Sequence, residues 1–211
     1  NTRSGKSPKP SPPSPRAAVA QGRQPADTVI RGGTLVNVCT AEFPENIDIA
    51  IAEGRIALVG DATACIGPDT EIIDASGLYM SPGFLDGHIH IESSMLSVGE
   101  YAKAVVPHGT VGIYPDPHEI CNVPGLDGVR CMIEDAGRTP LKCMFVTPSC
   151  VPAVPGFEDT GSFVGPEDVA RTMQWDEIVG LGEMMNFPGI HASDDHAHGI
   201  VDATLAADKV V

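Results

Sequence analysis

The stretch Met80-Ser-Pro-Gly-Phe-Leu-Asp-Gly-His-Ile-His-Ile-Glu-Ser-Ser-Met95 decides how the rest of the sequence is interpreted. It opens within an apolar segment, residues 78–85, that is long enough for one buried strand. His88 and His90 follow two residues apart, and on an extended backbone such side chains face the same way. Both imidazoles can therefore reach one divalent cation while Ile89 points into packing. The alternative is an accidental pair with solvated rings, but the polar residues that follow indicate a strand end opening into a site.

Four motifs give the sequence a resemblance to a known family. Residues 82–90, Pro-Gly-Phe-Leu-Asp-Gly-His-Ile-His, resemble the first-strand motif of the amidohydrolase superfamily, whose members are metal-dependent hydrolases built on a β/α barrel. The continuation Ile91-Glu-Ser-Ser-Met95 is similar to the adenine deaminase branch of that superfamily. So are Asp116-Pro-His-Glu-Ile120, Pro148-Ser-Cys-Val-Pro152 and Gly180-Leu-Gly-Glu-Met-Met-Asn-Phe-Pro-Gly189. The resemblance runs from about residue 26 to residue 211.

The order of expected elements predicts an α/β protein in three parts. Residues 1–25 are rich in Pro, Ser and basic residues, and we expect a disordered tail. Residues 26–77 alternate with a period of two, which predicts a small β-rich module. The resemblance implies that this module is part of a composite β-sandwich. Residues 78–211 alternate strands with helices, which predicts the first four-plus units of a TIM-type β/α barrel, an incomplete N-terminal half.

The polar clusters all follow expected strands, at the rim where β/α barrels build their active sites. Glu183 follows the fourth strand in an apolar setting, where an ionised carboxylate is costly unless it is paired or bound to metal. An N-cap or a rim salt bridge is the alternative role. The resemblance implies that Glu183 is a catalytic carboxylate that bridges two divalent cations, and that His88 and His90 are metal ligands beside it.

Other positions support weaker hypotheses. Glu92 and Ser93 could contact the edge of a purine substrate, or they could pack the first loop. His118 could contact the substrate or another metal, or it could be a rim histidine hydrogen-bonded in a turn. Asp86 is expected to orient a histidine ligand. The histidines and aspartates of residues 191–198 could form a metal site, although they are expected on a polar, mobile loop.

The resemblance implies an activity, the hydrolytic deamination of adenine to hypoxanthine and ammonia in purine salvage. It implies a binuclear centre of Mn²⁺ or Fe²⁺, with Zn²⁺ as the alternative, and a homodimer at full length. Further ligands are expected beyond Val211, so we expect this N-terminal part to be inactive alone. Two alternatives stay open. One is a truncated, non-catalytic protein that binds metal weakly through His88 and His90. The other is a dihydroorotase- or hydantoinase-like amidohydrolase, in which a lysine usually takes the place of Glu183.

Composition excludes several classes of protein. The formal net charge of −15 argues against binding to a nucleic-acid backbone. The sequence holds no run of 18 or more apolar residues, so we expect no transmembrane helix and no membrane partner. The six cysteines show no Cys-x-x-Cys spacing. We therefore expect free thiols in a reducing compartment and a cytoplasmic location.

Overall fold

The structure is a computed structural model that describes residues 14–211. The chain divides into two compact units, Asn1–Pro82 and Gly83–Val211. The expectation of a disordered tail over residues 1–25 lies partly outside the described residues, and for residues 14–25 it is wrong. Helix α1, Pro15–Ala20, begins after the N-cap Ser14 and buries Val19. A short run of good helix formers can form a helix when a neighbouring core covers its one large apolar side chain.

The first unit is a five-stranded sheet in the order β3-β2-β1-β4, with β5 also paired to β1. Its strands are β1 Thr28–Leu35, β2 Ile47–Ala52, β3 Arg55–Gly60, β4 Glu71–Asp74 and β5 Tyr79–Met80, and a single turn of 3-10 helix, η1, spans Thr63–Cys65. The expected hairpin at Glu53 and Gly54 is confirmed, since β2 and β3 are antiparallel and both turn residues have positive φ, 52° and 68°. That pair of angles is typical of a type I′ turn.

Strand β1 continues through the two glycines at which the sequence analysis expected a break. Its pairing with β2 instead shifts register between Ile30 and Gly33. The buried Asp48 carboxylate stabilises this irregular region, because it accepts hydrogen bonds from the backbone N–H of Gly32 at 3.0 Å and of Ala62 at 3.2 Å. The hydrogen bonds to Asp48 thus allow strand β1 to continue through the irregular register.

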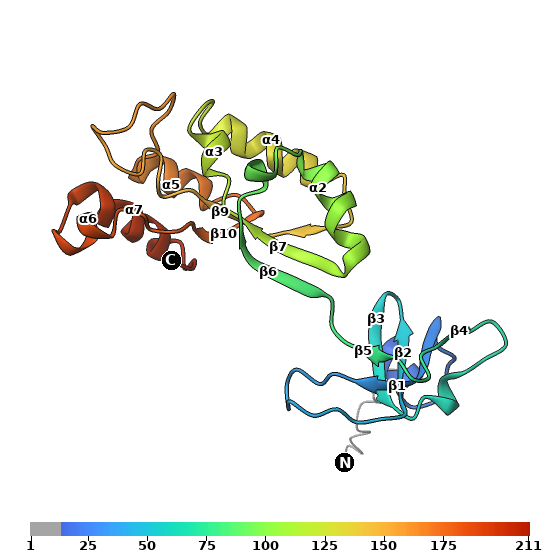
Figure 1. Cartoon of the computed structure of the whole chain (residues 1–211). Coiled ribbons are helices and arrows are strands. Elements are labelled where there is room, and N and C mark those ends of the chain that lie inside the picture. The colour runs from blue at the N-terminus through green and yellow to red at the C-terminus, as the bar shows by residue number, and fades with distance from the viewer. Residues whose placement is uncertain (1–13) are drawn as a thin grey trace, which may run out of the picture. The chain divides into compact units, whose positions relative to one another are not determined.

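Parallel strands alternate with helices in the second unit (Figure 1). The strands are β6 Phe84–Ile89, β7 Thr110–Pro115, β8 Lys142–Cys143, β9 Phe145–Thr147 and β10 Ile178–Leu181. Sheet β6-β7-β8 and sheet β9-β10 are both parallel. Residues 142–147 pass from one sheet to the other, because Met144 N–H still bonds to Ile113 while Phe145 N–H bonds to Glu177. The predicted α/β class with parallel strands is confirmed.

The helical elements of the second unit are η2 Ile91–Ser94, α2 Val98–Val105, η3 Val106–His108, α3 His118–Cys121, α4 Leu126–Ala136, α5 Pro166–Thr172, α6 Phe187–His191 and α7 Asp195–Ala206. Helices α2 and α4 lie along one face of β6 and β7 (Figure 1). The core between helices and strands includes Ile113, Val129, Phe145, Val169 and Ile178. Among residues 14–211, no helix is both long and apolar enough to span a membrane.

Two expectations about this region are wrong. The strand expected at residues 78–85 is divided, since Tyr79–Met80 joins the first unit and β6 begins only at Phe84. The boundary between the units therefore falls at residue 82 instead of residue 77. Pro82 and Gly83 explain the division, because neither residue favours a continuous strand. Residues 191–198 do not form a loop, since α6 ends at His191 and α7 begins at Asp195.

Candidate metal centre

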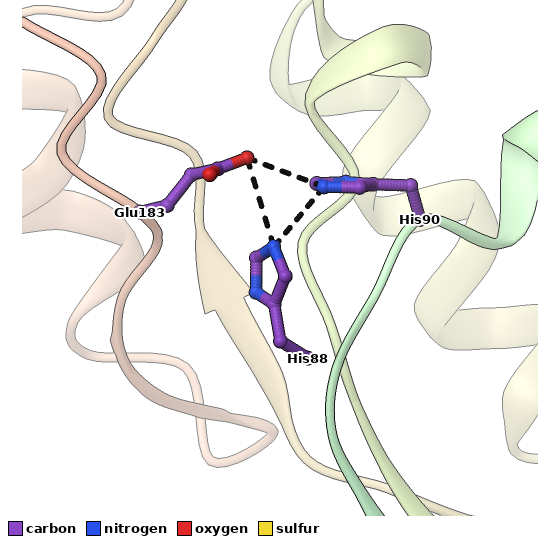
Figure 2. A group of neighbouring side chains, drawn as sticks. All are labelled: His88, His90 and Glu183. Carbon is purple, nitrogen blue, oxygen red and sulfur yellow. Dashed lines mark hydrogen bonds and ion pairs between the residues drawn. The ribbon is translucent and has the colours of Figure 1, made fainter.

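Three side chains from the ends of two distant strands converge in the second unit (Figure 2). His88 belongs to β6, His90 follows β6 directly, and Glu183 lies two residues after β10. The two Nε2 atoms lie 3.1 Å apart. Glu183 Oε1 lies 3.2 Å from His90 Nε2 and 3.6 Å from His88 Nε2. The expectation that Glu183 lies on the same side as both imidazoles, with both rings aimed at a common point, is confirmed, although β6 and β10 belong to separate sheets.

The donor set fits a divalent cation. Two imidazole nitrogens and a carboxylate oxygen are common ligands of Zn²⁺ and related metals. Ligand atoms around a tetrahedral cation with bonds of 2.0–2.1 Å lie about 3.3 Å from one another. The three separations at this site, 3.1, 3.2 and 3.6 Å, bracket that value. The intervening Ile89 packs against the core, so the strand aims the two rings together as expected.

The orientation of His90 also suits metal binding. Its Nδ1 lies 2.9 Å from the carbonyl oxygen of Asp116, which can only accept a hydrogen bond. Nδ1 must therefore carry the proton, and in the neutral ring the Nε2 lone pair faces His88 and Glu183. Burial is the largest influence on the pKa of His90 and lowers it. The hydrogen bond to Asp116 and the charges of Glu119, Asp116 and Glu183 outweigh burial and raise that pKa overall.

The sequence analysis did not assign a role to Asp116, which lies at the centre of this arrangement. It is fully buried, and its Oδ2 accepts a hydrogen bond from the backbone N–H of Glu183 at 3.0 Å. Burial is the main cause that raises the pKa of Asp116. A Cβ atom on Gly182 would lie only 2.2 Å from Asp116 Oδ2, so the close approach requires glycine. The available signal was the motif 116–120, which begins one residue after β7.

A second carboxylate, Glu119, joins two of the weaker candidates. Ser93 Oγ donates a hydrogen bond to Glu119 Oε1 at 2.8 Å. The other oxygen, Oε2, lies 3.8 Å from His118 Nε2 and 3.7 Å from His90 Nδ1. Glu92 instead accepts a hydrogen bond from the backbone N–H of Ile120 at 3.2 Å, which supports its packing role. The structure thus places Ser93 and His118 beside the candidate metal centre and connects Glu92 to helix α3.

Two other hypotheses about site residues fail. Asp86 accepts a hydrogen bond from the backbone N–H of His88 at 3.2 Å, so it does not orient an imidazole as expected. The polar residues between 191 and 198 instead stabilise helices α6 and α7. His198 Nε2 donates to the carbonyl of Ile190 at 2.9 Å, and Asp194 caps α7. Within the described part of the chain they form none of the candidate metal-binding groups.

A cavity of about 420 Å³ adjoins the centre. Its lining combines the polar groups of His88 and Glu183 with apolar side chains from neighbouring strands, among them Tyr114, Val146 and Val179. A mostly apolar cavity of this size with a few convergent polar groups is typical of a small-molecule site.

Comparisons with known proteins agree with this geometry. Residues 79–211 match the model of the amidohydrolase family, so the chain belongs to that family. It is 72% identical over 195 residues to the adenine deaminase of Clostridium botulinum (strain ATCC 19397 / Type A), a match that covers 92% of this chain and 33% of that protein. It is 59% identical over 194 residues to the adenine deaminase of Moorella thermoacetica (strain ATCC 39073 / JCM 9320), with coverage of 92% and 32%.

The chain therefore spans about a third of the length of these relatives. The resemblance to the adenine deaminase branch is confirmed. Among solved structures, atrazine chlorohydrolase TrzN from Arthrobacter aurescens TC1 is similar, with a TM-score of 0.50 and 17% identity over 69% of this chain and 41% of that chain. This likeness concerns the fold alone.

Proposed function

We propose that the chain supplies part of the active site of an enzyme that hydrolyses adenine to hypoxanthine and ammonia. The observation that carries the proposal is the convergence of His88, His90 and Glu183 in a chain that is 72% identical to an adenine deaminase. The cavity beside these residues has room for a small heterocycle such as a purine.

In the proposed reaction His88 Nε2, His90 Nε2 and the Glu183 carboxylate would hold a divalent cation. A divalent cation held there would lower the pKa of bound water and so would supply hydroxide at neutral pH. The Asp116 carbonyl holds His90 in the tautomer that presents Nε2, and the Asp116 carboxylate holds the backbone beside Glu183. Water adds at C6 of adenine, ammonia leaves, and hypoxanthine is the product.

Several finer points belong to the same proposal. We infer from the resemblance to the amidohydrolase superfamily that the centre would be binuclear, with Mn²⁺ or Fe²⁺, and that Glu183 would be the carboxylate shared by the two cations. We also propose that the full-length enzyme acts in purine salvage, is located in the cytoplasm and forms a homodimer.

The test is an assay of ammonia release from adenine with the complete product of the gene that encodes this chain. The metal-free protein should be inactive and should regain activity with Mn²⁺ or Fe²⁺. His88→Ala and Glu183→Gln should each lower kcat/KM at least 100-fold, whereas His108→Gln, which changes an exposed histidine outside the site, should leave it unchanged. Dihydroorotate and hydantoin serve as competing substrates. Turnover of either in preference to adenine, or full activity of His88→Ala, would exclude the proposal.

A further inference from the structure

The sequence motif of residues 148–152 contains a buried hydroxyl, that of Ser149, to which the proposed reaction gives no role. Ser149 is only 6% exposed, and its Oγ donates a hydrogen bond to the backbone carbonyl of Glu183. It does not line the cavity beside the candidate metal centre. Its hydroxyl therefore contacts the backbone of a candidate metal ligand and does not face a small molecule in that cavity.

The register of two parallel strands brings Ser149 to Glu183. Thr147, the last residue of β9, pairs with Leu181, the last residue of β10. Gly182 N–H then donates to the Thr147 carbonyl at 2.7 Å. Two residues beyond the paired strand ends, Ser149 stands opposite Glu183. The serine side chain thus supplies a cross-strand hydrogen bond at a point where both strands have ended.

The position of the Glu183 carboxylate depends on the backbone that carries it. The side chain is 40% exposed, and among the described residues its ion-pair contacts are with three imidazoles, those of His88, His90 and His118. Contacts between partly solvated groups of this kind order a side chain weakly. The direction in which Glu183 leaves the chain is therefore set mainly by what holds its N–H and its carbonyl.

We propose that Ser149 is a positioning residue of the candidate metal centre, which holds Glu183 at its carbonyl while Asp116 holds it at its N–H. The same carbonyl also accepts from Met185 N–H at 3.2 Å, so Ser149 shares this acceptor with the turn that follows. With both backbone groups held, the Glu183 side chain extends toward His88 and His90 (Figure 2). This inference deepens the proposed function and rests on it.

The test compares Ser149→Ala with Thr204→Val in the 211-residue chain. Thr204 is the matched control because it is also buried, and its hydroxyl also donates to a backbone carbonyl, that of Ile200, at 2.9 Å. It lies within helix α7 and outside the candidate metal centre. Each substitution removes one buried hydroxyl, so a purely structural role of Ser149 predicts the same outcome for both variants. Circular dichroism verifies that each variant is folded.

Two readouts follow the backbone and the ligand separately. In the metal-free chain, amide hydrogen exchange measured by NMR should be at least about 5-fold faster at Glu183 N–H in Ser149→Ala, because local opening there no longer breaks the serine hydrogen bond. The amides of helix α4 should exchange at the wild-type rate. In calorimetry, Ser149→Ala should bind Mn²⁺ roughly 10-fold more weakly, as is typical when a group that orients a metal ligand is removed. Thr204→Val should match the wild type in both measurements.

The inference is overturned if folded Ser149→Ala keeps the wild-type exchange rate at Glu183 N–H, or if it binds Mn²⁺ as tightly as Thr204→Val does. Faster exchange that extends to helix α4 also overturns it, because Ser149 would then contribute to general stability alone. A folded wild-type chain that binds no Mn²⁺ contradicts the proposed function. In that case the exchange rate at Glu183 N–H by itself decides whether Ser149 holds Glu183.

Discussion

Replacing Gly182 with alanine should disturb the candidate metal centre through Asp116. The new Cβ would lie 2.2 Å from Asp116 Oδ2 and 2.9 Å from Oδ1, and the fully buried side chain must move away. It would then lose the hydrogen bond from Glu183 N–H. A hydrogen bond to a charged group contributes about 1.5–3 kcal/mol. Since 1 kcal/mol shifts Tm by about 2–4 °C in a chain of this size, Tm should fall by roughly 3–12 °C.

The same variant should bind Mn²⁺ at least 10-fold more weakly, because displacement of Glu183 removes a ligand from its position. Calorimetry measures the affinity, and circular dichroism measures Tm. Gly137→Ala is the matched control. Gly137 is exposed with a φ of −60°, and a Cβ there meets no atom closer than 3.5 Å. If Gly182→Ala melts and binds Mn²⁺ like Gly137→Ala, the contact between Asp116 and Glu183 does not position the ligand.

Two further predictions concern the rest of the chain. Asp48→Ala leaves two backbone donors without their partner and should lower the free energy of unfolding by about 2–4 kcal/mol in urea titrations, with unchanged Mn²⁺ affinity; a change below about 0.5 kcal/mol would contradict this role. Burial raises the pKa of the Cys121 and Cys150 thiols to about 12, so their thiolate fraction grows only as the pH rises toward that value. Iodoacetamide at pH 8 should therefore label the exposed Cys39 and Cys131 in the native chain and spare Cys121 and Cys150, as mass spectrometry can show; equal labelling of all four would refute the burial.

Much of the second unit could be predicted because its signals are local. The spacing of His88 and His90 depends only on the alternation of side chains along β6, and the parallel order of strands follows from the alternation of strand and helix patterns. Glu183 could be placed at the same end because the carboxyl ends of parallel strands lie together. The hairpin at Glu53 and Gly54 likewise depends on two adjacent residues.

Two of the omissions and errors share a physical cause, which is dependence on distant contacts. Helix α1 is stabilised by burial of Val19 in a core that the composition of the tail does not reveal. Asp116 lies 67 residues from its partner Glu183, so only the folded chain shows that its carboxylate meets that backbone N–H. Asp86 precedes His88 closely, but its carboxylate bonds to the backbone and leaves the ring to other groups.

The most direct measurement of the central claim is anomalous diffraction from crystals of this chain grown with Zn²⁺, recorded on both sides of the zinc absorption edge. The account predicts a peak bonded to His88 Nε2, His90 Nε2 and a Glu183 carboxylate oxygen, at about 2.0–2.2 Å from each. Zinc peaks that lie only at other positions, with these three side chains bound to no ion, would contradict it.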